Sequence, residues 1–578
     1  MKSIHKRLRI LLSQRRISEG KAGETNDWGG HWPSVRQVGL LYLHLLIINL
    51  ITKSLKSHTF FFFGLLLTAG IGGPACVQAQ QVRPAQRAAA SRELIANPVL
   101  PGDYPDPSVV KIGDNYWASA TTSNWGPSFP LLKSKNLTDW ELVGHVFPGE
   151  RPAWADYYFW APEISHEGGK TYIYYAAHQR GGNLAVGVAS ADNPAGPYRD
   201  HGPLVGQSDG SIDAFPMRDE HGQLFLIWKE DGNSIGRPTP IWAQPMNEER
   251  TALTGEKKEL FHNDTPWEAG LVEGVSMVRK DGYFYAFYAG NRCCGSGCTY
   301  ATGVARAKSL LGPWEKYAQN PILTNNDTWK CPGHGTVFQQ GSRWLMLHHA
   351  YAAQGFQYVG RQGVISEITW TADGWPSFMG HSTPVAVAPV VRPPVYDDFS
   401  APTLRAVWEW PIKARPAVAV QDGQLRLTAQ PGGSGAVLAQ PITALAYTAT
   451  VTLLNPAALP AGTVAGLTAH GDPDNALAFT AGGGQLQLWQ REKGQQKVLA
   501  AVPLPTAPNL QLRLQAQAGS QFRCAWSTDG GRSWQPVPTA ANGTALPPWD
   551  RGVRVGVLAQ GPATSTAVFD DFRLVNQP

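Results

Sequence analysis

The sequence predicts an all-β protein in which a five-bladed β-propeller is followed by a β-sandwich. The 578 residues include 61 Gly, 45 Pro, 21 Trp, 18 Tyr and 20 Phe, which favours many short strands joined by tight turns. A short aromatic segment recurs five times between residues 100 and 390, and apolar residues alternate with other residues beyond residue 420. Because 43% of the residues are apolar and only 16% are charged, we expect packed cores rather than intrinsic disorder.

Residues 1–79 are predicted to be a leader that is cleaved on export, which leaves a secreted or periplasmic protein. Lys53 and Lys56 precede an apolar run at residues 60–71, and the small-residue pattern of a cleavage site ends at Ala79. The alternative is a membrane anchor, but this run is too short to span a bilayer. We therefore expect no membrane span in the mature chain.

The leader also accounts for the net charge of +5. Residues 1–79 hold ten Lys and Arg against three Asp and Glu, and the rest of the chain holds 39 against 41. A mature chain with this balance has no basic surface for nucleic acid. A second apolar run lies upstream of the first, so residues 1–52 are interpreted as an over-extended translation start. Residues 80–95 are interpreted as a linker.

Residues 96–391 are predicted to form the propeller. The five aromatic segments lie about 50–60 residues apart, the spacing of blades with four strands each. Residues 185–191 reappear as a similar segment at 301–307, two blades later, which supports the register. The aromatic segments are residues 115–117, 171–174, 224–228, 283–287 and 344–347.

One polar residue precedes each aromatic segment by roughly ten residues, in an otherwise apolar or turn context. The innermost strands of a propeller run side by side around a central channel, so equivalent positions on them converge near the axis. Any one of these residues is readily explained as a turn or cap. Five in register predict a functional site. They are Asp106, Glu163, Asp213, Glu273 and His334.

Four cysteines lie near one another in the later blades. Cys293, Cys294, Cys298 and Cys331 are interpreted as forming one or two loop disulfides, with the pairing left open. Disulfides agree with export to an oxidising compartment. A zinc site is disfavoured because two of the cysteines are adjacent and no His follows at the spacing of a zinc finger.

Six short motifs occur in order between residues 97 and 390. They are residues 97–108 (NPVLPGDYPDPS), 134–140 (SKNLTDW), 160–163 (WAPE), 211–213 (SID), 272–274 (VEG) and 333–335 (GHG). In this order they resemble the motifs of glycoside hydrolase family 43. Two departures, Ala214 and Val275 where proline is common in that family, bear on the substrate more than on the chemistry.

The resemblance implies hydrolysis of a glycosidic bond with inversion. It makes Asp106 the general base, Glu273 the general acid, and Asp213 the residue that orients Glu273 and raises its pKa. Inversion needs one group to protonate the leaving oxygen and another to activate water. A third carboxylate suits this reaction, because like-charge repulsion keeps the acid protonated.

Sugar binding needs flat apolar surfaces and a few hydrogen-bond donors. Trp125, Trp160 and Phe215 lie near the motifs and are candidate substrate contacts, although each also fits a core position. The resemblance implies that Arg361 reaches the substrate and that His334 lies near a calcium ion or its waters. The alternative for His334 is a hydrogen-bonded core histidine. No cofactor is required for the chemistry, and calcium is expected only as a structural ion.

Residues 396–578 are predicted to form a β-sandwich. Residues 396–399 and 569–572 resemble the first and last strands of the concanavalin-like, jelly-roll domains appended to family-43 enzymes. Asp397 and Asp571 lie in these strands, and either a calcium site or ordinary edge-strand charges would explain them. The alternating apolar positions include Leu425, Leu427, Leu486, Leu488, Leu512, Leu514, Val553, Val555 and Val557.

These features predict a secreted, inverting, exo-acting hydrolase of plant-type polysaccharides or oligosaccharides, either a β-xylosidase or an α-L-arabinofuranosidase. A galactosidase or galactofuranosidase of the same family is the alternative. A retaining, fructosidase-like propeller is disfavoured because its arginine-aspartate-proline and glutamate-cysteine motifs are missing. A non-catalytic carbohydrate-binding propeller would not need Asp106, Asp213 and Glu273 together.

Overall fold

The computed structural model describes residues 95–379 and 394–577. The predicted leader, its cleavage point at Ala79 and nearly all of the linker lie outside these ranges. Within them, no helix is both long enough and apolar enough to cross a membrane. Strands dominate, and the helical elements are single turns: η1 (Gly232–Ile235), η2 (Pro266–Glu268), α3 (Phe356–Val359) and η4 (Pro456–Ala458).

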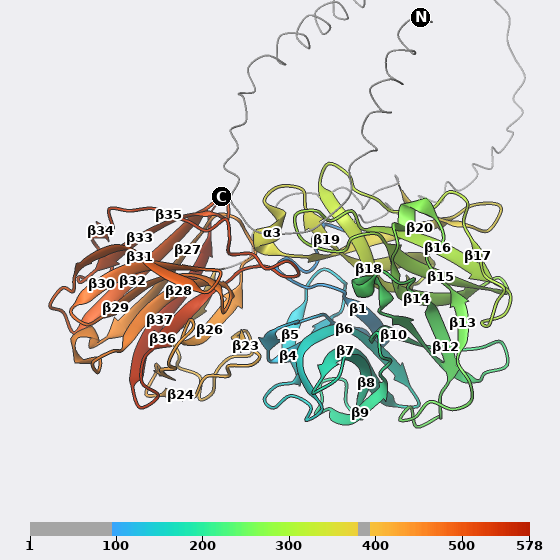
Figure 1. Cartoon of the computed structure of the whole chain (residues 1–578), viewed down its shortest axis with the longest axis horizontal. Coiled ribbons are helices and arrows are strands. Elements are labelled where there is room, and N and C mark those ends of the chain that lie inside the picture. The colour runs from blue at the N-terminus through green and yellow to red at the C-terminus, as the bar shows by residue number, and fades with distance from the viewer. Residues whose placement is uncertain (1–94, 380–393, 578) are drawn as a thin grey trace, which may run out of the picture. The chain divides into compact units, whose positions relative to one another are not determined.

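Five antiparallel sheets of four strands form the first domain, coloured blue to yellow in Figure 1. Blade 1 holds β1 (Ser108–Ile112), β2 (Asn115–Ser119), β4 (Ser128–Ser134) and β5 (Glu141–Phe147). Blade 2 holds β6 (Ala155–Glu167), β7 (Lys170–Gln179), β8 (Leu184–Ala191) and β9 (Arg199–Val205). Blade 3 holds β10 (Ser211–Arg218), β11 (Leu224–Glu230), β12 (Ile241–Pro245) and β13 (Lys258–Phe261).

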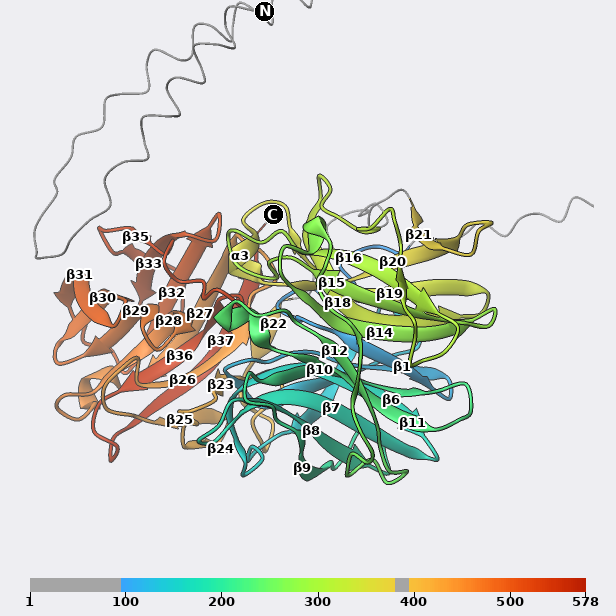
Figure 2. The same ribbon diagram turned by 45° about the vertical axis from the view of Figure 1, so that its right-hand side comes forward.

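The last two blades continue the pattern. Blade 4 holds β14 (Val272–Lys280), β15 (Tyr283–Gly290), β16 (Ala301–Ala307) and β17 (Glu315–Lys316). Blade 5 holds β18 (Trp329–Gln340), β19 (Arg343–Ala352), β20 (Gln362–Trp370) and β21 (Pro376–Phe378). The innermost strands contact one another in a closed ring, in the order β1, β6, β10, β14, β18 and back to β1. Figures 1 and 2 both show β14 beside β18. The predicted five-bladed propeller is confirmed.

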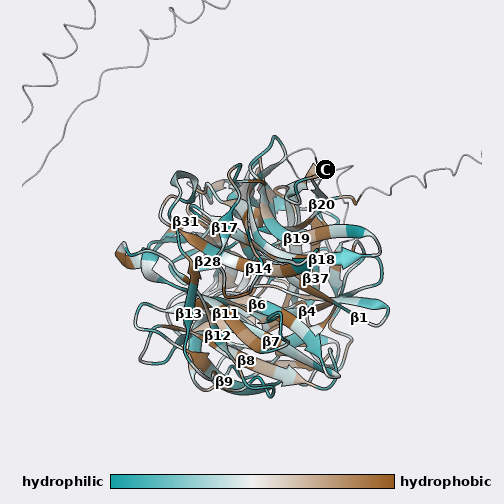
Figure 3. Ribbon diagram, turned by 90° about the vertical axis from the view of Figure 1, so that its right-hand side faces the viewer, coloured by the Kyte–Doolittle hydropathy of each residue, from teal (hydrophilic) through white to brown (hydrophobic). Residues whose placement is uncertain are grey.

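The sequence repeats fall at equivalent places in the blades. All five aromatic segments lie in the second strand of a blade, and the repeated segments 185–191 and 301–307 lie in the third strands β8 and β16. Their apolar side chains fill the space between neighbouring blades. Figure 3 shows the same division: hydrophobic colour runs along strands such as β14, and the loops are largely hydrophilic.

Two packed sheets form the second domain, coloured orange to red in Figure 1. One contains β22 (Val395–Asp397), β24 (Val418–Gln421), β25 (Gln424–Thr428), β27 (Tyr447–Leu454), β32 (Asn509–Gln517), β33 (Gln521–Ser527), β34 (Gln535–Pro536), β35 (Ala541–Asn542) and β37 (Thr566–Asn576). The other contains β26 (Ala436–Pro441), β28 (Val464–Asp472), β29 (Asn475–Gly482), β30 (Gln485–Glu492), β31 (Gln495–Pro503) and β36 (Arg554–Gln560).

The sandwich core is built from the alternating positions that the sequence indicates. All nine predicted leucines and valines are buried in one cluster between the two sheets. A further pair of short strands, β3 (Trp125–Gly126) and β23 (Trp410–Pro411), connects the propeller to the sandwich by antiparallel pairing. The predicted β-sandwich is confirmed.

Candidate active site

Four of the five polar residues predicted at the propeller axis line one cavity of about 880 Å³. Asp106 lies two residues before β1, and the others lie on innermost strands: Asp213 on β10, Glu273 on β14 and His334 on β18. Glu163, on β6, is not among the lining residues and accepts a hydrogen bond from Thr336 Oγ1 at 3.0 Å. The structure therefore brings four of the five repeated positions together in one cavity.

Irregular backbone turns these side chains toward the cavity. The β10–β11 register shifts directly after Ile212, and the β14–β15 register shifts directly after Glu273. Such bulges redirect side chains from a sheet into a site. Asp106, Asp213 and His334 have φ of 49°, 57° and 36°, a left-handed conformation that is uncommon outside glycine and clusters at functional sites.

Glycine at position 274 allows the close approach of His334. Its φ is +62°, and a Cβ there would lie 2.7 Å from Cγ of His334. A side chain would therefore push the histidine of β18 away from Glu273. This steric requirement explains the glycine of the 272–274 motif.

Asp106 has the environment of an ionised base. Its carboxylate accepts hydrogen bonds from Thr121 Oγ1 at 2.7 Å and from Arg361 Nη1 at 3.0 Å. Burial raises its pKa, but the charge of Arg361 and the neighbouring His349 and His334 outweigh burial and hold the pKa well below its usual range. Asp106 is therefore a carboxylate at any working pH, as a general base requires.

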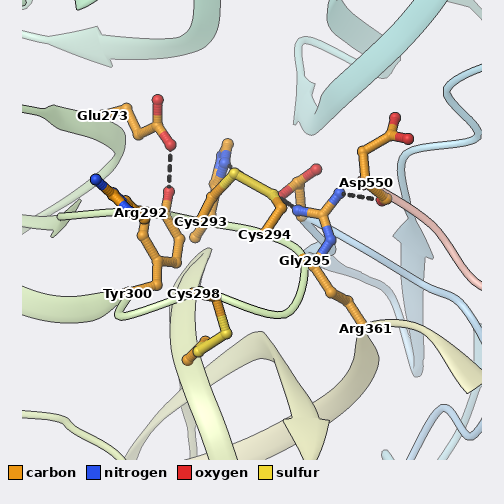
Figure 4. Close-up of a disulfide and its surroundings, with 12 residues drawn as sticks. Glu273, Arg292, Cys293, Cys294, Gly295, Cys298, Tyr300, Arg361 and Asp550 are labelled. Atoms are coloured by element: carbon orange, nitrogen blue, oxygen red, sulfur yellow. Dashed lines mark hydrogen bonds and ion pairs between the residues drawn. A yellow bond between two sulfur atoms is a disulfide. The ribbon is translucent and has the colours of Figure 1, made fainter. Parts of the chain in front are cut away.

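Glu273 lies between two donors that sequence reasoning missed. Lys229 Nζ is 2.7 Å from Oε2. The Tyr300 hydroxyl donates to Oε1 at 2.8 Å (Figure 4). Burial raises the pKa of Glu273, but Lys229, Tyr300 and His334 outweigh it and lower the pKa below its ordinary value. Lys229 is itself 1% exposed and also pairs with Asp231 at 2.7 Å.

Asp213 is placed to act on Glu273 through the backbone and by charge. Its Oδ2 accepts a hydrogen bond from the amide of Gly274 at 2.9 Å, directly beside Glu273. Its pKa is raised to about 6, mainly by burial and further by the charge of Glu273, against the lowering effect of His334 and Lys229. Asp213 and Glu273 therefore form a pair that shares a proton. That Asp213 keeps this proton on Glu273 stays a prediction.

Two substitutions should move the basic limb of the pH profile in opposite directions. Activity requires one proton on the Asp213–Glu273 pair, so the basic limb of kcat/KM should lie near pH 6. Asp213→Asn removes a negative charge and should shift that limb to lower pH. Lys229→Met removes a positive charge and should shift it to higher pH. Because the pKa of Asp106 is held well below its usual range, Asp106 should add no acidic limb at working pH in the wild type or in either variant.

The measurement is kcat/KM against pH on one aryl glycoside for the wild type and both variants. An unchanged basic limb with near-normal activity in Asp213→Asn would show that Asp213 is only a turn residue. Thermal unfolding serves as the control, because Lys229→Met leaves the partly buried Asp231 without this partner and should lower Tm.

Of the predicted substrate contacts, Trp160 and Arg361 line the cavity. Trp160 stacks on Tyr158 with ring centroids 4.4 Å apart, and its Nε1 donates to Ser123 Oγ at 3.0 Å. Arg361 forms an ion pair with Asp106, and this pair fixes its position.

Trp125 and Phe215 are not cavity residues, and their prediction as substrate contacts is wrong. Trp125 is 2% exposed and packs against sandwich side chains such as Trp489, because β3 pairs with a strand of that domain. Phe215 follows the bulge of β10, pairs with Ile227, and lies in the core between blades 3 and 4.

The sandwich domain contributes Trp549 and Asp550 to the cavity wall, which sequence reasoning also missed. Trp549 is 54% exposed and contacts Trp160 edge-on, with ring centroids 6.2 Å apart. The Asp550 carbonyl accepts a hydrogen bond from Arg361 Nη2 at 3.0 Å (Figure 4), and its carboxylate accepts one from Ser123. The site is thus completed by both domains.

A buried network fixes the two domains to each other beside Arg361. The Asp103 carboxylate accepts hydrogen bonds from the Arg361 amide at 3.1 Å and from the Gly552 amide at 2.9 Å. It also pairs with Arg554 Nη1 at 2.6 Å, and Arg554 reaches Glu409 at 2.9 Å. The position of Arg361 therefore depends on how the sandwich docks.

The predicted calcium positions do not gather ligands. Asp397 accepts hydrogen bonds from Trp408 Nε1 and the Phe399 amide, whereas Asp571 accepts one from the Tyr396 hydroxyl. His334 Nδ1 lies 3.6 Å from Asp106 and 3.8 Å from Asp213. In residues 95–379 and 394–577, no three His, Cys, Asp or Glu side chains are arranged to hold a metal ion. Calcium binding stays a prediction, and no catalytic step is derived from it.

Of the one or two loop disulfides predicted, two form. Cys293 pairs with its neighbour Cys294, and Cys298 pairs with Cys331. Within the part of the chain that the structure describes, Cys524 is the free cysteine, and it is buried in the sandwich core.

Comparison with known proteins agrees with this architecture. Xylan 1,3-beta-xylosidase from Vibrio sp is 28% identical over 358 residues, 54% of this chain and 64% of that protein. Xylosidase/arabinosidase 43B from Humicola insolens is 28% identical over 306 residues, 49% of this chain and 54% of that protein. The matched segments thus span less than two thirds of these relatives.

The crystal structure of xylan beta-1,4-xylosidase from Bacillus halodurans shows the same fold. The TM-score is 0.72 at 23% identity, with 83% of this chain and 100% of that chain covered. Residues 95–376 match glycosyl hydrolases family 43, and residues 396–575 match the beta xylosidase C-terminal concanavalin A-like domain. With both domains matched in the order that the structure shows, the chain belongs to glycosyl hydrolases family 43.

Proposed function

We propose that the protein is an exported, inverting, exo-acting glycoside hydrolase that releases terminal xylose or L-arabinofuranose from plant oligosaccharides or polysaccharides. The observation that carries this proposal is one cavity with three carboxylates in opposed states. Asp106 is held ionised, while Asp213 and Glu273 form a pair that retains a proton near pH 6. Pairs of acids whose surroundings separate their pKa values are the mark of acid–base assignments.

The reaction follows from these states. Asp106 accepts a proton from a water molecule as the water oxygen attacks the anomeric carbon. The proton of the Asp213–Glu273 pair passes through Glu273 to the glycosidic oxygen as the bond from that oxygen to the anomeric carbon breaks. The new hydroxyl lies on the face opposite the departed group, so the anomeric configuration inverts. Transfer of one proton from Asp106 to solvent and uptake of one by the Asp213–Glu273 pair restores the enzyme.

The cavity walls support removal of terminal units. The cavity is bounded by Trp160, by Trp549 and Asp550 of the sandwich, and by residues 291–294. The names of the relatives, a xylosidase and a xylosidase/arabinosidase, support a pentose as the terminal sugar. Two loop disulfides fit export to an oxidising compartment.

A panel of nitrophenyl glycosides tests the substrate. β-D-xyloside or α-L-arabinofuranoside should be hydrolysed with the highest kcat/KM, and β-D-galactoside and galactofuranoside should be poor substrates. Preference for a galactoside would overturn the pentose assignment. Failure to cleave any member, together with failure to cleave natural oligosaccharides, would overturn the enzyme assignment.

A further inference from the structure

The bonded cysteines Cys293 and Cys294 both line the cavity that holds the carboxylates. Figure 4 shows their disulfide between Glu273 with Tyr300 on one side and Arg361 with Asp550 on the other. Arg361 is the residue that binds Asp106. The disulfide therefore lies along the stretch of wall that connects the general acid to the general base.

This stretch of wall faces the terminal sugar. In an inverting reaction the anomeric carbon lies between the acid and the base, so the ring that carries it occupies the space between Glu273 and Asp106. A wall that runs from beside Glu273 to beside Arg361 flanks that ring. The sugar on the leaving side lies beyond the glycosidic oxygen that Glu273 protonates.

A disulfide suits contact with a sugar ring. Two free thiols are weak hydrogen-bond donors, and joining them removes both donors. What remains is a pair of polarisable, weakly accepting sulfur atoms, which make favourable dispersion contacts with C–H groups. The face of a sugar that carries ring C–H bonds needs such a surface, and binding sites for small molecules are mainly apolar with few polar groups.

The loop that carries the disulfide is fixed to the propeller independently of it. Cys298 is bonded to Cys331 of β18, the Thr299 amide donates to the Arg292 carbonyl at 2.9 Å, and the Asn291 amide donates to the Glu268 carbonyl at 3.0 Å. Neither Cys298 nor Cys331 lines the cavity. One disulfide therefore anchors the loop, and the other is displayed to the cavity.

We propose that the Cys293–Cys294 disulfide is a substrate-binding surface that packs against the C–H face of the terminal sugar ring. The proposal rests on the proposed function and deepens it. The sulfur atoms contribute to recognition of the sugar that is released, and they take no part in the chemical reaction.

The double variant Cys293→Ser/Cys294→Ser tests this surface, since it keeps the size of each side chain and replaces the sulfurs with hydrated hydroxyls. On the better of 4-nitrophenyl β-D-xyloside and α-L-arabinofuranoside, kcat/KM should fall by about tenfold or more, mostly through KM. The corresponding disaccharide should lose the same factor, because the terminal sugar is common to both. The inhibition constant of the free monosaccharide should rise by a similar factor.

The matched control is Cys298→Ser/Cys331→Ser, which removes the anchoring disulfide and leaves the cavity surface in place. It should lower Tm but leave the inhibition constant of the monosaccharide near the wild-type value. If this control weakens binding of the monosaccharide as much as Cys293→Ser/Cys294→Ser does, the Cys293–Cys294 disulfide acts only by ordering the loop. The inference is then wrong.

Two further outcomes would overturn the inference while leaving the proposed function intact. One is an unchanged monosaccharide inhibition constant in Cys293→Ser/Cys294→Ser with normal wild-type hydrolysis. The other is a loss confined to the disaccharide, which would place the disulfide against the leaving sugar. Absence of hydrolysis by the wild type would instead overturn the proposed function, and the inference with it.

Discussion

Glu273→Gln should lower kcat/KM on natural disaccharides by about 10²–10⁴-fold, the usual contribution of general acid catalysis. The amide keeps the shape of the side chain but has no proton to give to the glycosidic oxygen. Aryl glycosides with a good leaving group should lose much less, since their leaving oxygen departs without protonation. The measurement is kcat/KM for both substrate types, with circular dichroism and Tm to confirm the fold.

The chain offers a matched control for this variant in Glu163→Gln. Glu163 is the equivalent residue of blade 2, but it does not line the cavity. Burial raises its pKa to about 8, so it is protonated at neutral pH and glutamine closely resembles it. The kcat/KM of Glu163→Gln should match that of the wild type on both substrate types. Equal losses on the disaccharide and the aryl glycoside in Glu273→Gln would contradict the assignment of the general acid.

Asp106→Asn should also lower kcat/KM by about 10²–10⁴-fold. The loss should be equal for disaccharides and aryl glycosides. Attack by water is required for either leaving group, and an amide cannot take the proton from that water. The variant should fold, although Arg361 loses its charged partner and Tm should fall. The ratio of the two losses distinguishes the variants, because it is near one for Asp106→Asn and large for Glu273→Gln.

An aryl glycoside that retained near-normal turnover in Asp106→Asn would contradict the assignment of the general base. Steady-state kinetics at the pH optimum of each variant is needed, so that a shift in protonation is not mistaken for a loss of chemistry.

The propeller and the carboxylates of the cavity were predictable because they occupy repeated positions. Each blade must place an aromatic second strand against its neighbours, and each innermost strand must pass the axis at the same level. The repeated spacing therefore identifies these positions without any knowledge of side-chain contacts. They are Asp106, Asp213, Glu273 and His334. Glu163 shares that position but turns away to Thr336, a difference of side-chain direction that spacing alone does not reveal.

The cavity residues that the sequence analysis did not predict lie outside the positions that repeat from blade to blade. The sequence does contain an indication of Lys229, because it is a charged residue at the end of the apolar run of β11. In the structure it is almost fully buried. A buried lysine needs partners of opposite charge, which would have suggested a carboxylate nearby. No sequence pattern indicates Trp549 and Asp550, because they lie in a sandwich loop and reach the site only through docking of the two domains.

The errors at Trp125 and Phe215 have one cause. Nearness in sequence to a motif says nothing about the face of the strand on which a side chain lies. Trp125 is covered by the second domain, and the bulge after Ile212 places Phe215 in the core. Aromatic residues are common in both cores and sugar sites, so residue type did not separate the two settings.

The stereochemistry of the first product tests the central claim most directly. Proton NMR should follow hydrolysis of an aryl glycoside or disaccharide at early times, before mutarotation equilibrates the anomers. If Asp106 activates water while Glu273 protonates the leaving oxygen, the released sugar should first appear in the anomeric configuration opposite to that of the substrate. First appearance of the retained anomer would show a glycosyl-enzyme intermediate and would contradict the roles assigned to these two carboxylates.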